Sequence, residues 1–126
     1  MFYQVRKRQD NIHEDKPVKF YPYPRYMGKV NLQQLSEEIA NASSLTRGDV
    51  ESTVLNLLDT MSKYLKEGHS IQLGEFCTLR MSFSADGSDE KEEVDHTKIK
   101  KTKLVFTPGK GLRKHLKDVN FQLFRK

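Results

Sequence analysis

Hydrophobic residues between positions 31 and 68 recur with helical spacing in two blocks. Each block follows a capping box, in which an oxygen-bearing side chain precedes an amide or an acid by three positions; the two pairs are Asn31 with Gln34 and Thr46 with Asp49. The spacing predicts a first helix over 32–43 and a second that ends at Gly68, since glycine suits a helix C-terminus. The apolar face of the second helix is too broad for the first helix alone to cover, so it requires a further partner.

After Gly68 the pattern changes to a period of two, which is typical of strands. A short strand over 71–73 and a bend at Gly74 lead into a longer strand. Its apolar residues share one face: Cys77, Leu79, Met81 and Phe83. The polar and acidic segment 84–93 predicts a loop or the tip of an arm, and 94–98 predicts a short helical turn.

Three more elements follow toward the C-terminus. They are a strand through Leu104 and Phe106 that Pro108-Gly109 ends, a short basic helix with Leu112 and Leu116 on one face, and a final strand with Val119, Phe121 and Leu123. At the other end of the chain, extended segments are expected over 3–8 and 17–23, around the polar stretch 10–16. Pro17, Pro22 and Pro24 restrict the second segment to an edge or irregular strand, because proline cannot donate to a ladder. The fold class is therefore α+β.

Composition predicts a thin hydrophobic core. Only 36% of the 126 residues are hydrophobic and none is tryptophan, so oligomerisation is expected. The single cysteine, Cys77, excludes an intrachain disulfide and suits a reducing compartment; on its alternating strand it is interpreted as a small buried hydrophobe. No apolar run approaches the roughly 18 residues that cross a bilayer, and no secretion segment opens the chain. We expect a cytoplasmic protein with no membrane partner.

Charge is distributed unevenly along the chain. The overall net charge is +5, but residues 1–30 carry +4, 31–84 carry −3, 85–97 carry −5 and 98–126 carry +9. So basic a C-terminal quarter favours phosphate or another polyanion, although a solvated basic surface kept for solubility is an alternative from charge alone.

Local strings resemble the HU/IHF family of bacterial histone-like DNA-binding proteins. The string from Ile71 to Leu79, IQLGEFCTL, is similar to the family's first hairpin strand, and the string from Phe106 to Arg113, FTPGKGLR, is similar to its Phe-x-x-Gly-Lys-x-Leu-Lys signature. Leu45–Val50 lies where the family enters its second helix. The resemblance covers 30–118, which is expected to form an HU/IHF-like domain, with 1–29 as a strand-rich N-terminal extension and 119–126 as a C-terminal strand or tail.

The resemblance implies an intertwined homodimer. In this family a base of helical hairpins carries a β-sheet saddle with two arms and a short C-terminal helix. Independently of the resemblance, the apolar face of the second helix needs more cover than the first helix provides, and a second subunit would supply it. The complete layout is similar to an HU-related branch with added terminal strands.

The predicted arm departs from the family pattern. The family carries arginines on the first arm strand and an Arg-Asn-Pro-x-Thr-Gly tip, where this sequence has Ser82, Ser84 and Gly87 and an acidic tip over 86–93. HU and IHF are themselves reference examples of minor-groove binders that often kink the duplex with an apolar wedge. No proline occurs between Pro24 and Pro108, so DNA bending is not expected to carry over.

Basic residues near the C-terminus are the predicted DNA contacts. They are Lys98, Lys100, Lys101, Lys103, Lys110, Arg113 and Lys114. The first four straddle both faces of a strand, so they cannot all meet one surface. Lys110 matches the lysine of the family signature, and Pro108-Gly109 precedes a helix N-terminus that we expect to receive a phosphate. The predicted contacts are to the DNA backbone rather than to base edges.

Other candidate sites are assigned ordinary structural roles. Tyr21, Tyr23 and Tyr26 lie among basic residues and could stack on nucleobases, but packing of the added segment is the favoured interpretation. The four histidines lack the spacing of metal ligands, so no metal and no cofactor are expected. No catalytic constellation is present, and an enzyme is not expected.

The sequence thus predicts a non-catalytic homodimer that binds double-stranded DNA largely without sequence preference at the bacterial nucleoid. The alternative is a dimeric scaffold of HU-like fold that has lost DNA binding and binds protein through its N-terminal strands and the acidic loop 86–95. That loop could also shield the basic surface from DNA. The basic tail favours DNA, whereas the acidic tip and the missing wedge favour the scaffold.

Overall fold

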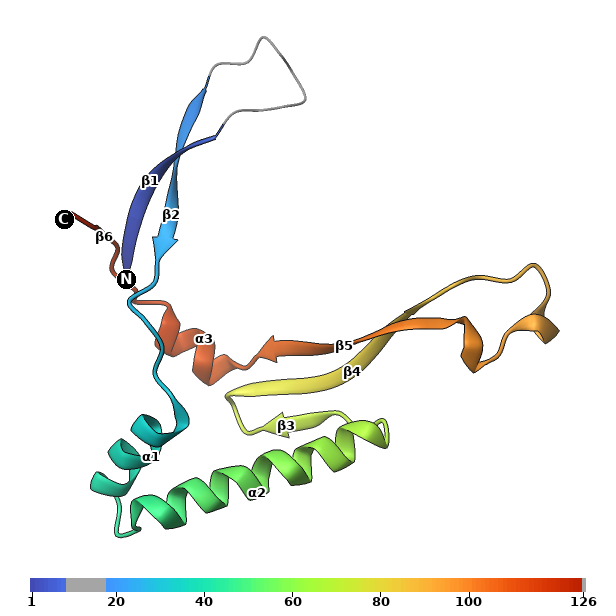
Figure 1. The fold of residues 1–126 in the computed structure, drawn as a ribbon, viewed down its shortest axis with the longest axis horizontal. Helices are drawn as coiled ribbons and strands as arrows, with labels where there is room; N and C mark the ends of the chain where they lie inside the picture. Colours follow the sequence, from blue (N-terminus) through green and yellow to red (C-terminus); the bar gives the residue numbers. More distant parts are fainter. Residues whose placement is uncertain (9–17, 126) are drawn as a thin grey trace. The chain divides into compact units, whose positions relative to one another are not determined.

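A computed structural model describes residues 1–8 and 18–125 (Figure 1). The expected polar stretch 10–16 and the start of the second extended segment lie outside the described residues. The chain divides into two compact units, one formed by residues 31–116 and the other by residues 1–30 together with 117–126. The described residues form an α+β protein with three α-helices and two three-stranded sheets.

The unit 31–116 begins with the predicted helical hairpin. Helix α1 spans Leu32–Asn41 and helix α2 spans Arg47–Lys66. Both capping boxes are formed, which confirms the two helix starts. The second helix ends where predicted, because Gly68 adopts a φ of 90° and its N–H donates to the Leu65 carbonyl oxygen at 3.1 Å.

An antiparallel sheet and a third helix complete this unit. The strands, in the order β3-β4-β5, are β3 (Ile71–Leu73), β4 (Cys77–Ala85) and β5 (Ile99–Pro108), and helix α3 spans Lys110–Leu116. Because β3 pairs only as far as Leu79, the outer part of β4 and β5 is a two-stranded arm (Figure 1). Two 3-10 turns, η1 (Lys91–Glu93) and η2 (His96–Lys98), lie in the connection at its tip. The second of them confirms the helical turn predicted over 94–98.

The hydrophobic core of the single chain is thin, as its composition predicts. Among the described residues only Val50 and Cys77 are buried apolar side chains, with exposed fractions of 4% and 2%. The interpretation of Cys77 as a small buried hydrophobe is confirmed. Ser36 of α1 is fully buried in the same unit. So small a core leaves large side chains of both helices and of the arm exposed to solvent.

The terminal unit is a separate sheet with the strand order β2-β1-β6. Strand β1 (Phe2–Arg8) pairs antiparallel with β2 (Lys19–Arg25) and parallel with β6 (Gln122–Leu123). The N-terminal ammonium group donates to the Asn120 carbonyl oxygen at 2.7 Å. The predicted final strand is therefore correct only at Leu123, because β6 has partners only at the first two residues of β1.

Candidate nucleic-acid interface

The register of the arm gives it two chemically different faces. Residues directly opposite one another in an antiparallel pair lie on the same face of the sheet. Leu79 faces Phe106, Met81 faces Leu104 and Phe83 faces Thr102, so one face is apolar. We call Leu79, Met81, Phe83, Leu104 and Phe106 the apolar arm face.

The opposite face of the arm is basic. Lys103 lies opposite Ser82, Lys101 lies opposite Ser84, and Arg80 lies opposite Val105. All three cations are exposed. We call Arg80, Lys101 and Lys103 the basic arm face. The register therefore brings two of the predicted contacts together and adds Arg80, which the sequence analysis missed. The sequence carried the signal for Arg80, because it lies between Leu79 and Met81 on an alternating strand and so belongs to the opposite face.

The other two lysines of this segment do not join the basic arm face. A β-bulge shifts the register where Ala85 pairs with Ile99, which leaves Lys100 without a position in the ladder. The Lys100 ammonium instead pairs with the Asp86 carboxylate at 2.8 Å. Lys98 is half-buried at the end of η2. The four lysines therefore do not share one surface, as expected, but they do not straddle a single strand either, because Lys98 lies outside β5 and Lys100 lies at the bulge.

Helix α3 supplies a second group of cations. Its three cations are exposed. Arg113 and Lys114 follow Lys110 by three and four positions, so all three share one side of the helix. Leu112 is half-buried on another side.

The N-terminus of α3 is not the phosphate site that the sequence suggested. Gly109 N–H donates to the Phe76 carbonyl oxygen at 2.8 Å, and Gly111 N–H donates to the Glu75 carbonyl oxygen at 3.0 Å. Leu112 N–H shares the Glu75 oxygen at 3.4 Å. A Cβ atom at position 109 would lie only 2.1 Å from that oxygen. The prediction was wrong because the helix end binds the β3–β4 turn, and the glycines of the signature permit that close approach.

The acidic tip lies where the basic arm ends. Its acids are Asp86, Asp89, Glu90, Glu92, Glu93 and Asp95, all exposed. Asp95 caps η2 by accepting a hydrogen bond from Thr97 N–H at 3.0 Å. Of the two ion pairs found between described residues, only Asp86 with Lys100 joins the tip to a predicted DNA contact.

The structure also bears on the minor candidate sites. No group of three or more potential metal ligands is close enough to hold an ion within the described residues. None of the described helices is long and apolar enough to cross a membrane. Tyr26 is 76% exposed and Tyr21 is 40% exposed, and the packing of these tyrosines onto the HU-like unit stays a prediction. Only Tyr23 of the three is half-buried.

Comparisons with known proteins agree with this fold. The profile of the HU-HIG family, described as an HU domain fused to wHTH, Ig, or Glycine-rich motif, matches residues 1–123. No curated protein was found to match the sequence. The fold is similar to a crystal structure from Bacteroides vulgatus ATCC 8482 described as a "Putative bacterial DNA binding protein", with a TM-score of 0.65 and 13% identity. The match covers 98% of this chain and 48% of the other, so this chain spans about half of that protein's length.

Proposed function

The chain belongs to the HU-HIG family of fused HU domains, and from this premise we propose that it binds double-stranded DNA as a homodimer. Binding is non-catalytic and largely independent of sequence, because it uses phosphate contacts rather than base edges. A protein with this activity acts at the bacterial nucleoid, in the cytoplasm.

The two-faced arm carries this proposal. Its apolar face needs cover, whereas its basic face needs a polyanion. When the apolar arm face is buried against protein, Arg80, Lys101 and Lys103 are turned away from that contact and toward solvent. One orientation of the arm therefore satisfies both requirements, with protein on one side and DNA on the other.

Exposed apolar side chains support the homodimer. Ten large ones on α1, α2 and the arm are each between 43% and 55% exposed: Leu35, Ile39, Leu55, Leu57, Leu58, Tyr64, Met81, Phe83, Leu104 and Phe106. Completing the burial of each would contribute roughly 1 kcal/mol. A second copy offers the same helices and the same apolar arm face, so a symmetric pair can cover both.

DNA binding is tested by salt titration of the affinity. If each subunit supplies three or four phosphate contacts, a dimer makes six to eight, and the log–log slope of affinity against salt is about −5 to −7. We expect the triple variant Arg80→Gln/Lys101→Gln/Lys103→Gln to weaken binding of a linear duplex at least 30-fold and to flatten the slope by about 5.

Lys100→Gln is the matched control, since it removes one charge from the same strand at the bulge. Its affinity should stay within about twofold of the parent protein, because Lys100 is engaged by Asp86. If backbone charge dominates, the variants should change the affinity for linear, nicked and four-way DNA by similar factors. A parent slope near zero, or equal binding by the triple variant, would instead favour the protein-binding scaffold, with the acidic loop 86–95 as its docking segment.

A further inference from the structure

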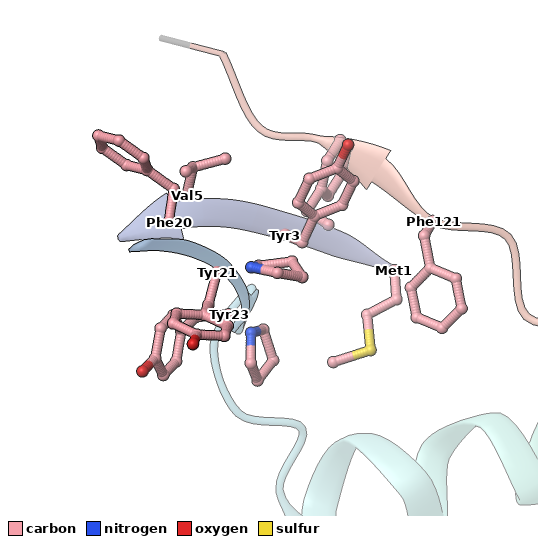
Figure 2. A pocket seen from close by; sticks show the side chains of 10 residues that line it. Met1, Tyr3, Val5, Phe20, Tyr21, Tyr23 and Phe121 are labelled. Carbon is pink, nitrogen blue, oxygen red and sulfur yellow. The ribbon is translucent and has the colours of Figure 1, made fainter. Parts of the chain in front are cut away.

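The hairpin of β1 and β2, which we call the terminal ribbon, also has two unlike faces. Tyr3 lies opposite Pro24, Val5 opposite Pro22, and Lys7 opposite Phe20, so this face is largely apolar. An open groove of about 730 Å³ lies along the ribbon, and its lining includes Met1 and Phe121 as well as Tyr21 and Tyr23 of β2 (Figure 2).

The other face of the terminal ribbon alternates aromatic and basic residues. Gln4 lies opposite Tyr23, Arg6 opposite Tyr21 and Arg8 opposite Lys19. Figure 2 shows the rings of Tyr21 and Tyr23 projecting to the same side of β2. We call these six residues the aromatic ribbon face.

The charge of the terminal unit favours a polyanion. The described residues 1–8, 18–30 and 117–125 carry eight basic side chains and one acid, a net charge of +7. The described contacts of Arg6 are to neutral groups. Its guanidinium carbon lies 5.3 Å from the centroid of the Tyr23 ring, and its Nε and Nη2 donate to the Gln4 side-chain oxygen when that amide is turned toward them. The guanidinium is thus oriented while its charge remains available.

Aromatic rings distinguish this face from the basic arm face. Tyr21 and Tyr23 are two residues apart on one strand, about 6.6 Å, which is close to twice the roughly 3.4 Å spacing of stacked bases. Rings at this spacing match alternate positions of a base stack. In a duplex the base faces are already stacked on each other, so aromatic rings on a protein surface select unpaired bases.

We propose that the aromatic ribbon face binds single-stranded DNA. Bases stack on Tyr21 and Tyr23, while Arg6, Arg8 and Lys19 contact the phosphates. Three such contacts predict a log–log salt slope of about −2 for a single strand. The site is in a different unit from the basic arm face, so it does not depend on duplex binding there.

The stacking step is tested by anisotropy with a labelled oligothymidylate and the full chain. Tyr21→Leu/Tyr23→Leu should weaken binding about 10-fold or more, whereas Tyr21→Phe/Tyr23→Phe, which keeps the rings, should stay within about twofold. The chain has five tyrosines and no tryptophan, so quenching of tyrosine fluorescence by the single strand reports stacking directly. The leucine variant should lose most of that quenching.

The charge step has a control on the opposite face. Arg6→Gln/Arg8→Gln should weaken single-strand binding about 10-fold, whereas Lys7→Gln removes a charge from the largely apolar face and should change it less than twofold. Lys7 lies over Phe20, with its ammonium nitrogen 6.0 Å from the ring centroid. Thermal melting of each variant establishes that the terminal sheet is still folded.

The two binding sites are separated by testing both probes on both sets of variants. The triple arm variant should lose duplex affinity and keep single-strand affinity, and the terminal-ribbon variants should do the reverse. Folded ribbon variants with unchanged single-strand affinity would overturn this proposal while leaving duplex binding untouched. Loss of single-strand binding in the arm variant alone would overturn it too, because the strand would then occupy the arm.

Discussion

The arm and the terminal ribbon are both antiparallel hairpins with most of their cations on one face and most of their apolar residues on the other. They differ in what lies between the cations. On the basic arm face the neighbours are the small hydroxyls of Ser82 and Ser84, whereas on the aromatic ribbon face they are the rings of Tyr21 and Tyr23. Small neighbours let a phosphate backbone approach closely, and rings offer a surface for bases. Under the two proposals, the same strand pairing serves two forms of DNA.

The hairpins also differ in their tips and anchors. The arm ends in an acidic segment, and its base is held by the close approach of Gly109 to the Glu75 carbonyl oxygen. The base of the terminal ribbon is held by the C-terminal segment, since Phe124 N–H donates to the Tyr3 carbonyl oxygen at 2.8 Å. Phe124 also packs edge-on against Phe2, with 5.8 Å between ring centroids.

The largest effect should follow from a charge on the apolar arm face. Leu104→Glu places a carboxylate where the proposed homodimer needs apolar cover, and an unpaired buried charge costs several kcal/mol. We expect the dimer to dissociate at micromolar concentration and duplex affinity to fall about 100-fold, because a monomer keeps half of the contacts. Sedimentation equilibrium and anisotropy measure the two losses.

Two variants sharpen this result. Lys103→Glu alters the residue next to Leu104, on the opposite face of the arm, and its charge change is twice that of Leu104→Glu. Because this residue lies outside the apolar arm face, the variant should leave the dimer intact and weaken only DNA binding. Val5→Glu makes the corresponding change on the apolar side of the terminal ribbon and should leave the dimer intact as well. A Leu104→Glu protein that remained fully dimeric would exclude the apolar arm face from the interface.

Local signals in the sequence were sufficient for the helices. Capping boxes and the position of Gly68 depend only on neighbouring residues, so the ends of α2 were predicted closely. The faces of the arm were predictable for β4, where alternation is uninterrupted. They were not predictable for β5, because the bulge at Ala85 changes the phase of Lys100 relative to Lys101, and a bulge depends on strand pairing rather than on local sequence.

Long-range contacts explain the remaining errors. The string Pro108-Gly109-Lys110 has the appearance of a phosphate-binding turn, yet the N–H groups of Gly109, Gly111 and Leu112 donate to a turn more than thirty positions earlier in the chain. The pairing of β6 with β1 joins opposite ends of the chain. Neither contact leaves a periodic signal, so composition and spacing could not reveal them.

An intermediate effect is expected from Gly109→Ala, which attacks the anchor of the arm. The added methyl group would lie 2.1 Å from a backbone oxygen of Glu75, so the turn or the helix must move. We expect a loss of about 2–4 kcal/mol of unfolding free energy, measured by urea denaturation. Gly87→Ala at the tip has open space around its Cβ and should change stability by less than about 0.5 kcal/mol. Equal stability of both variants would contradict a close contact at Gly109.

The smallest effect concerns the tip, where the arm differs most from a uniformly basic hairpin. Replacing Asp89, Glu90, Glu92 and Glu93 by serine removes eight negative charges from a dimer without altering the basic arm face. If the acids repel the DNA backbone, duplex affinity at low salt should rise about 5- to 10-fold, and the gain should shrink above 0.2 M salt as screening increases. Gly87→Ala again provides a control, since it changes the tip without changing its charge. Unchanged or weaker affinity would mean that the acids do not shield the arm, and the tip would then be better explained as a solvated turn or as the docking segment of a protein partner.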